Sequence, residues 1–409
     1  MKTSKTKSPQ SSSWKKFTTL IILITTTSLL CIRFATFLEK PKEGFVEFKA
    51  TLLEEPKIFR NWQYFDIDGY ILQTVSDPTF EYGDILKIKG QLVGGKLSSP
   101  LIEKVGESTW QRKLYFFRQK LNDKITATLP QPESALLAGI VLGEKENLPA
   151  DLKDSLVRSG TIHVVVVSGY NISVVSGFLI GLAGFVHRRV AIILGLVGIA
   201  FYTFLVGADP PAVRAAIMGG LAFFAAFFGR QTFTFYALIL AGSLMFILEP
   251  AVLSNIGFQL SFLATAGIVV FQKRVLSIFR LLPKPLNDDL STTVSAQLLV
   301  APVIFYHFGS VSAISPAANA AVLWIIPIAT ILGFIFLLAA FIFMPIATII
   351  GWIIWALLFT FISLVNIFSK LPISYFTFKP SNILVLVFYY LCVLVIFLYL
   401  IYGRLAKSK

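Results

Sequence analysis

Residues 320–343 read AAVLWIIPIATILGFIFLLAAFIF, a run of 24 positions without a charged side chain. About 20 apolar residues in a helix are needed to cross the roughly 30 Å hydrocarbon core of a bilayer. A helix is the natural form there, because lipid offers no partner for an unpaired backbone N–H or C=O. The run therefore predicts a membrane-spanning helix.

Similar apolar blocks recur along the whole chain. Of its 409 residues, 56% are hydrophobic and 14% charged, whereas an ordinary soluble protein carries about 25% charged residues. The pattern predicts a polytopic α-helical membrane protein. Its ten expected spans lie at 17–37, 163–186, 190–206, 211–228, 233–248, 251–271, 291–308, 320–343, 346–368 and 382–402.

The positions of the basic residues predict the orientation in the membrane. The N-terminal tail is rich in lysine, and positively charged flanks stay cytoplasmic. Residues 1–38 are therefore expected to form a cytoplasmic tail and an uncleaved first transmembrane helix. Basic connections then alternate with acidic or neutral ones, and the C-terminal tail with Arg404 and Lys407 also falls inside. This placement accounts for most of the net charge of +14, which is consequently weak evidence for nucleic-acid binding.

Residues 39–107, between the first span and the others, are predicted to form an extracytoplasmic OB-like β-barrel domain. Short runs of alternating apolar and polar residues are separated there by turn formers such as Asp68-Gly69 and Gly94-Gly95. Such domains often bind single strands through basic grooves and aromatic side chains. Residues 44–106 carry nine acidic and seven basic side chains, and this balance predicts weak affinity for phosphates. A structural domain is the favoured interpretation.

Residues 108–130 have the pattern of a basic amphipathic helix at the membrane interface. Trp110, Leu114, Phe117, Leu121 and Ile125 recur at helical spacing. Two interpretations stay open: a simple interfacial anchor, slightly favoured, and an outer basic rim at a pore mouth that meets an anionic substrate. The rim would consist of Arg112, Lys113, Arg118, Lys120 and Lys124.

The remaining residues, 131–409, are expected to form one multi-span domain with polar groups inside it. Its first apolar segment, 135–143, is too short to span and predicts a re-entrant stretch. A single polar group in a span is usually an inter-helix hydrogen bond, but a set of them points to a substrate path. The candidate lining residues are His163, Ser168, Gly169, Asn171, Arg214, Gln259, Ser261, Gln297 and Asn319.

Features of an enzyme are not expected. Cys31 and Cys392 both lie in apolar blocks, and the three histidines are far apart in sequence, so neither a metal site nor a cofactor is predicted. The stretch before Leu97 imitates a phosphate-binding loop but lacks the hydroxyl that would bind Mg²⁺. We predict no catalytic residue.

Four ordered motifs resemble the ComEC competence family. They are GIVLGE at 139–144 with SGTIH at 159–163 and VSGYNI at 167–172; PPAVRAAIM at 210–218; GFQLSFLA at 257–264; and YHFG at 306–309 with Pro316 and Asn319. The resemblance implies a membrane channel that passes single-stranded DNA into a bacterium during natural transformation. It also implies a place in the bacterial cytoplasmic (inner) membrane.

The same resemblance implies partners and shows two departures. Beside single-stranded DNA and the lipid bilayer, a cytoplasmic motor ATPase and an extracytoplasmic DNA receptor are expected. Many family members continue into a metallo-β-lactamase-like domain; this chain looks like a form without it, so a separate nuclease is possible. Where many members have a histidine after the Ser-Gly pair, this chain has Tyr170-Asn171.

Two other function classes remain compatible with the residues. One is a secondary transporter of a small or lipid-linked anion, which internal symmetry between two halves would favour; no clear repeat is visible. The other is a scaffold whose outer domain only binds proteins.

Overall fold

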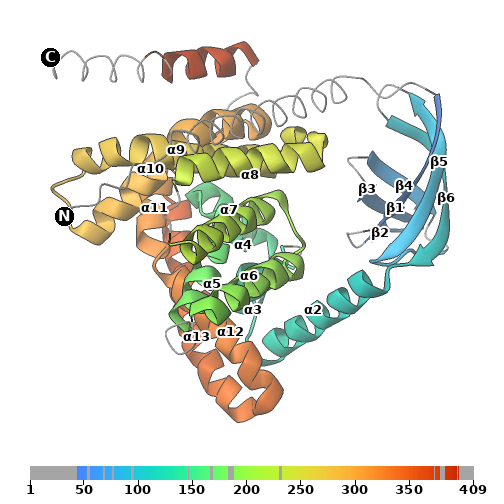
Figure 1. Cartoon of the computed structure of the whole chain (residues 1–409), viewed down its shortest axis with the longest axis horizontal. Helices are drawn as coiled ribbons and strands as arrows, with labels where there is room; N and C mark the ends of the chain where they lie inside the picture. Colours follow the sequence, from blue (N-terminus) through green and yellow to red (C-terminus); the bar gives the residue numbers. More distant parts are fainter. Residues whose placement is uncertain are drawn as a thin grey trace, which may run out of the picture.

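A computed structural model describes residues 44–52, 56–67, 70–75, 78–93, 96–145, 147–165, 169–182, 188–229, 233–372, 374–377, 383–393 and 395. Figure 1 shows a β domain at one flank, a single long helix leaving it, and a bundle of helices. The predicted first span at 17–37, both termini and Ser168 lie outside the described residues.

Six short strands form the β domain in two antiparallel sheets. One sheet has the order β1 (Gly44–Thr51), β5 (Asp84–Val93), β6 (Lys96–Glu107), and the other has β2 (Lys57–Phe59), β3 (Trp62–Ile67), β4 (Tyr70–Val75). A small core joins them, built from Leu52, Phe65, Leu72, Phe80, Leu86 and Ile88. The predicted β domain is therefore present. The described strands do not close into the expected OB-like barrel, because no ladder joins the two sheets.

A tight joint connects the β domain to helix α2 (Thr109–Thr128). The Ser108 N–H donates to the carbonyl oxygen of Gly83 at 2.8 Å. The Arg112 guanidinium forms ion pairs with both Glu81 and Glu107. Because these contacts fix both main chain and side chains, the helix and the β domain behave as one unit.

Replacing Arg112 by alanine is expected to loosen this joint, because two carboxylates lose their shared cation. Limited proteolysis should cut the segment between β6 and α2 several-fold faster. Lys113→Ala is the matched control, since Lys113 is an exposed neighbour with no ion pair among the described residues. Equal cleavage rates for the two variants would contradict the prediction.

Lys104 and Arg112 also hold the pKa of Glu107 below its ordinary value, so the joint should weaken as pH falls through that lowered pKa.

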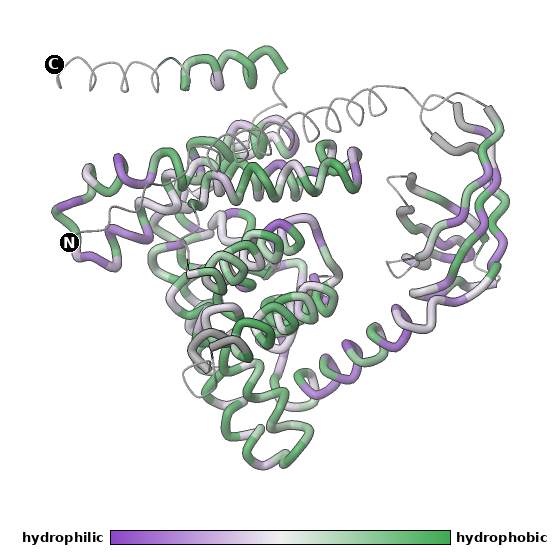
Figure 2. The backbone as a smooth tube through the Cα atoms, in the orientation of Figure 1, coloured by the Kyte–Doolittle hydropathy of each residue, from purple (hydrophilic) through white to green (hydrophobic). Residues whose placement is uncertain are grey.

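The bundle contains four helices that are long and apolar enough to cross a membrane in the part of the chain described: α9 (Ile256–Ile278), α10 (Lys284–Phe308), α12 (Ile325–Ile342) and α13 (Met344–Ser369). Shorter helices complete it. They are α3 (Glu133–Leu142), α4 (Ala150–Ser159), α5 (Gly169–Leu182), α6 (Arg188–Leu205), α7 (Pro210–Phe227), α8 (Thr234–Leu248), α11 (Ser315–Val322) and the segment Ile383–Val393, with short turns η1 (Ile162–Val164) and η3 (Pro250–Ser254) and the two-stranded pair β7 (Ser310–Ser312) and β8 (Tyr375–Thr377). Figure 2 shows the apolar character of these helices.

Several predicted spans begin with a break instead of a continuous helix. The span expected at 163–186 starts with η1, and its helix α5 begins only at Gly169. The span expected at 251–271 starts with η3; α9 follows, capped by Asn255, whose Oδ1 accepts from the Phe258 N–H at 3.0 Å. The span expected at 320–343 is divided between α11 and α12. Ten uninterrupted spans are thus not what the described residues form.

The predicted re-entrant segment is α3, at the centre of the bundle. All ten of its residues are buried, and a helix of this length, about 15 Å, cannot cross about 30 Å of hydrocarbon. Gly333 of α12 lies directly against Val141 of α3. Burial within protein on every side is the condition under which such a short segment is tolerated.

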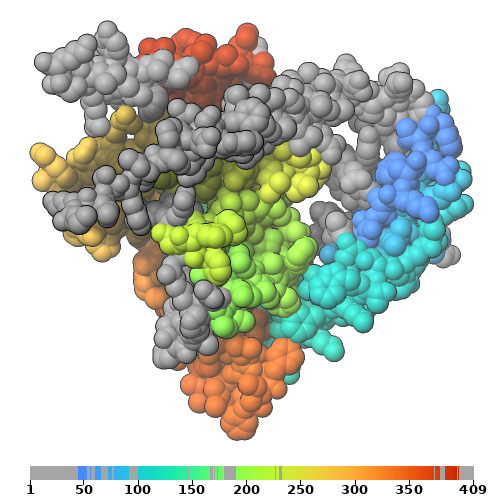
Figure 3. All heavy atoms as spheres, viewed as in Figure 1, coloured from blue at the N-terminus to red at the C-terminus, as the bar shows by residue number. Residues whose placement is uncertain are grey.

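Helix α2 packs its apolar face on this same core. Leu121 and Ile125 are buried there, and the Phe117 ring stacks on Phe341 of α12 with 6.5 Å between centroids. Figure 3 shows the atoms of α2, in teal, between the blue β domain and the orange α12–α13 pair. Protein thus covers the apolar face of α2 only toward its C-terminal end, while Trp110, Phe116 and Phe117 remain exposed.

Candidate functional site

The most unusual polar group of the bundle is Arg214, one turn into α7. Proline opens this helix at Pro210-Pro211, where the missing N–H costs nothing. The side chain is buried, with 7% exposed. Its Nη1 donates to the Thr265 hydroxyl of α9, and a methyl group on Gly169 of α5 would lie 2.5 Å from its Nη2. Three helices, α5, α7 and α9, thus meet at one guanidinium.

The charge of Arg214 is not neutralised within the described residues. None of their carboxylates forms an ion pair with it, and its Nε has no partner among them. An arginine at membrane depth costs about 2.5–3.5 kcal/mol on insertion scales unless it is paired or wet. A hydroxyl from Thr265 and a sulfur contact from Met218 at 3.8 Å hold its position without cancelling its charge. Such a group is suited to meet an anion.

Thr265 is a site residue that the sequence did not single out. Its hydroxyl accepts from Arg214 and donates to the main-chain oxygen of Ser261 at 3.0 Å. Ser261, a predicted lining residue, therefore takes part through its carbonyl. Positions four apart share a helix face, so the Ser261–Thr265 spacing was the available signal.

Asn171 contacts the short buried helix α3. It is fully buried, and its Nδ2 donates to the carbonyl oxygen of Ile140 at 3.2 Å. The Tyr202 hydroxyl of α6 donates to the same oxygen at 3.4 Å. The last four carbonyls of a helix lack intrahelical partners, and Ile140 is among them in α3. Asn171 thus has a clear structural role, although its Oδ1 has no partner among the described residues.

His163 and Asn319 meet at a second polar cluster around Gly160. This glycine ends α4 with φ of 72°, and its carbonyl oxygen lies 3.2 Å from His163 Nδ1. Ser315 donates to the same oxygen at 3.3 Å, and Asn319 Nδ2 donates to the Ser315 hydroxyl at 3.3 Å. Side chains at Ser315 and Ser312 leave no room for a Cβ on Gly160. The cluster fastens α4 to α11.

The two predicted glutamines stand apart from Arg214. Gln259 donates to the Leu253 carbonyl at 2.8 Å and lines a mostly apolar cavity of about 350 Å³ with Phe262 and Tyr390. Gln297, half-buried in α10, makes no hydrogen bond through its side chain to any described residue. The candidate lining set is therefore split over several places. Among the described residues no three His, Cys, Asp or Glu side chains gather where they could hold a metal ion.

The predicted basic rim on α2 is partly neutralised. Arg112 is paired with Glu81 and Glu107, and Arg118 Nε lies 3.4 Å from a carboxylate oxygen of Glu144. The other three members have no ion pair to any described carboxylate: Lys113, Lys120 and Lys124. Two of the five cations thus hold the protein together.

Comparisons with known proteins give one family and three relatives. The family described as "Competence protein" matches residues 140–402. The protein named "ComE operon protein 3" of Bacillus subtilis is 24% identical over 209 residues, 51% of this chain and 26% of that protein. An uncharacterized protein of Aquifex aeolicus is 34% identical over 160 residues, 39% of this chain and 37% of that protein. The uncharacterized protein YcaI of Escherichia coli is 25% identical over 229 residues, 53% of this chain and 30% of that protein.

The matches span between a quarter and two fifths of the length of these relatives. No solved structure matches the chain. The family match begins inside α3 and runs beyond the last described helical residue. It therefore includes Arg214, Asn171 and the polar cluster around Gly160.

Proposed function

Because this chain belongs to the Competence protein family, as its motifs indicated, we propose that it is a membrane channel that translocates single-stranded DNA across the cytoplasmic membrane during natural transformation. The name of its Bacillus subtilis relative supports a role in competence. The observation that carries the channel proposal is Arg214, a buried cation to which no described residue supplies a counter-charge.

A DNA strand presents one phosphate per nucleotide, and a guanidinium is the side chain best matched to phosphate oxygens, because its planar N–H fork can donate twice. At Arg214, Nη1 and Nη2 are directed to a neutral hydroxyl and to a glycine. A passing phosphate can replace the hydroxyl without having to break an ion pair. Exchange of this kind allows binding that is strong enough for entry and weak enough for release.

The wider arrangement follows from the same proposal. We place the chain as a multi-pass protein of the bacterial inner membrane, with both termini cytoplasmic and the β domain outside. The lysines of α2 would gather the strand. Transport requires a cytoplasmic motor ATPase as the source of energy, an extracytoplasmic DNA receptor, and a separate nuclease if one strand is degraded. The chain itself acts as a conduit and not as an enzyme.

Deleting the gene in a competent host tests the proposal. We expect uptake of labelled DNA into the cytoplasm to fall to background, because no other path carries the strand through the bilayer. DNA should still accumulate at the cell surface, which separates a transport defect from a binding defect. Expression of the intact chain should restore uptake. Unchanged uptake in the deletion strain would reject a role in transformation.

A further inference from the structure

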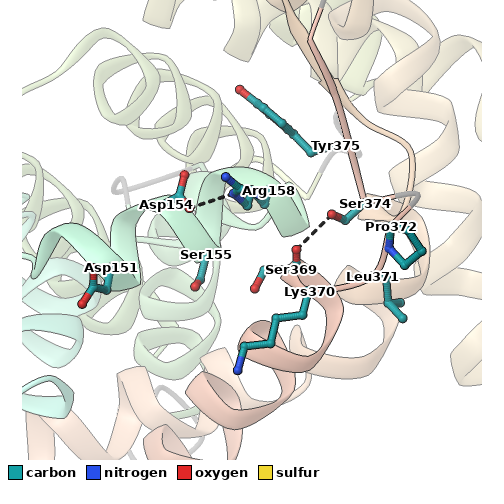
Figure 4. Close-up of a pocket in the computed structure, with 10 residues that line it drawn as sticks. All are labelled: Asp151, Asp154, Ser155, Arg158, Ser369, Lys370, Leu371, Pro372, Ser374 and Tyr375. Atoms are coloured by element: carbon teal, nitrogen blue, oxygen red, sulfur yellow. Dashed lines mark hydrogen bonds and ion pairs between the residues drawn. The ribbon is translucent and has the colours of Figure 1, made fainter.

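A cavity of about 400 Å³ opens between α4, the end of α13 and β8 (Figure 4). This volume falls within the usual range of small-molecule sites, about 300–1,000 Å³. Among the ten side chains that line it, only Leu371 and Pro372 are apolar. The cavity therefore suits a polar ligand far better than an acyl chain.

Hydrogen bonds between distant segments fix the walls of this cavity. Ser312 Oγ of β7 donates to the Arg158 carbonyl of α4 at 2.8 Å. Ser312 is also the strand partner of Tyr375, which places that ring beside α4. Ser374 Oγ donates to the Ser369 carbonyl at 3.0 Å, as Figure 4 shows. A site held from three segments is pre-organised for a ligand.

Two cations at the cavity keep donors available. Arg158 Nε bonds Asp154 at 2.7 Å, which leaves its two terminal NH₂ groups without a partner among the described residues. Lys370 Nζ has no partner there either. In Figure 4 these two side chains lie on either side of Ser155. Asp151 lies on α4, the helix that carries Arg158, and its carboxylate forms no ion pair among the described residues.

We propose that this cavity is a subsite for one nucleotide of a single strand. Lys370 and Arg158 bind the phosphate oxygens. The Tyr375 ring stacks on the base, and Asp151 accepts a hydrogen bond from a base amino group. The inference rests on the proposed function, since it gives the transported DNA strand a binding site between α4 and the C-terminal end of α13.

The mixture of groups favours a nucleotide over the other anions that Lys370 and Arg158 could hold. A free inorganic phosphate needs neither an aromatic ring nor a nearby carboxylate. A lipid headgroup would need apolar walls for its chains, and the cavity has few. A nucleotide uses all three kinds of group: cations, a ring and a hydrogen-bond acceptor.

Binding of fluorescein-labelled oligo-dC, whose bases carry an amino group, to the full chain in nanodiscs tests the site; it is measured by anisotropy over a range of salt. Lys370→Gln should weaken binding roughly five- to tenfold and lower the salt slope by about one. Tyr375→Ala should weaken it roughly five- to one-hundredfold with the slope unchanged, whereas Tyr375→Phe should bind normally. Lys153→Gln is the matched control: it removes an exposed lysine of α4 that does not line the cavity.

Each outcome decides the proposal. Equal affinities of the Lys370→Gln and Lys153→Gln variants would overturn the phosphate contact, and normal binding by Tyr375→Ala would overturn the stacking. Competition by inorganic phosphate as effective as by deoxycytidine monophosphate would reduce the site to an anion site and overturn the nucleotide assignment. If these variants bind normally while gene deletion abolishes uptake, the subsite fails and the channel function stands. If they bind weakly while deletion leaves uptake intact, the channel function fails and the subsite stands.

Discussion

Arg214→Gln is expected to lower DNA uptake by about tenfold to one-hundredfold, while the protein still inserts into the membrane and accumulates to a normal level. Charge-assisted hydrogen bonds contribute about 1.5–3 kcal/mol each, and one such contact to phosphate is lost. Glutamine keeps an amide that can hydrogen-bond, but it removes the charge and ends two bonds short of the Nη1 atom that reaches Thr265. Uptake of labelled DNA in a strain carrying the variant as its sole copy is the measurement.

Two further variants make this result specific. Lys273→Gln also removes one positive charge from the bundle, at an exposed position of α9, and should leave uptake near normal. Thr265→Val keeps the charge but removes the hydroxyl that positions it, so an intermediate loss is expected. Normal uptake by Arg214→Gln at normal protein level would show that the cation is structural and would remove the main support for the channel.

Gly267→Val should prevent assembly of the bundle. A Cβ at Gly267 of α9 would overlap the main-chain carbonyl oxygen of Ser295 in α10 and lie 3.3 Å from the Ala296 Cα. Main chain, unlike the end of a flexible side chain, cannot move aside, and overpacking of this kind costs roughly 1–3 kcal/mol or more. The α9–α10 pair should separate, and most of the protein should be lost.

The amount of monodisperse protein after detergent extraction, measured by size-exclusion chromatography, reads out this effect. Gly177→Val is the matched control, because nothing lies within 4 Å of a Cβ there. We expect several-fold less monodisperse protein for Gly267→Val than for the control. Equal yields would mean that the two helices can spread apart at no cost.

Buried polar groups could be picked out from the sequence because polar residues are rare in apolar helices. Arg214 and Asn171 were identified for that reason, and both are buried. Their partners were not, since partners depend on how helices cross. Thr265 bonds Arg214 although 51 positions separate them in the sequence. The pattern of residues within α9 does not indicate which residues of α7 it will contact.

Breaks within helices were harder to predict than the helices themselves. Apolar composition extends evenly through 320–343, so the sequence predicted one span, yet the structure has a turn between α11 and α12. The interruption lies four residues before Pro327, which has no N–H to donate to the Leu323 carbonyl and whose ring crowds that oxygen. This proline was a local signal for the break, but the even apolar composition hid it.

The basic rim illustrates the same limit for charge. The five cations of α2 left two interpretations open, an interfacial anchor and a rim that meets an anionic substrate, but Arg112 and Arg118 are paired with carboxylates from other segments. Only the folded structure shows which positive charges are already paired with carboxylates. The contact between Phe117 and Phe341 also departs from the sequence prediction. Ten alternating spans would place the turn between α12 and α13 on the membrane face opposite the β domain. In the structure α2, which leaves the β domain, contacts α12 beside that turn.

The joint at Arg112 has a mechanical consequence. Helix α2 is 20 residues long, about 30 Å, with one end clamped in the β domain and the other seated beside α3 through Leu121 and Ile125. A helix held at both ends acts as a stiff link. A displacement of the β domain is therefore passed along α2 to its contacts at Leu121 and Ile125, close to the short buried helix α3.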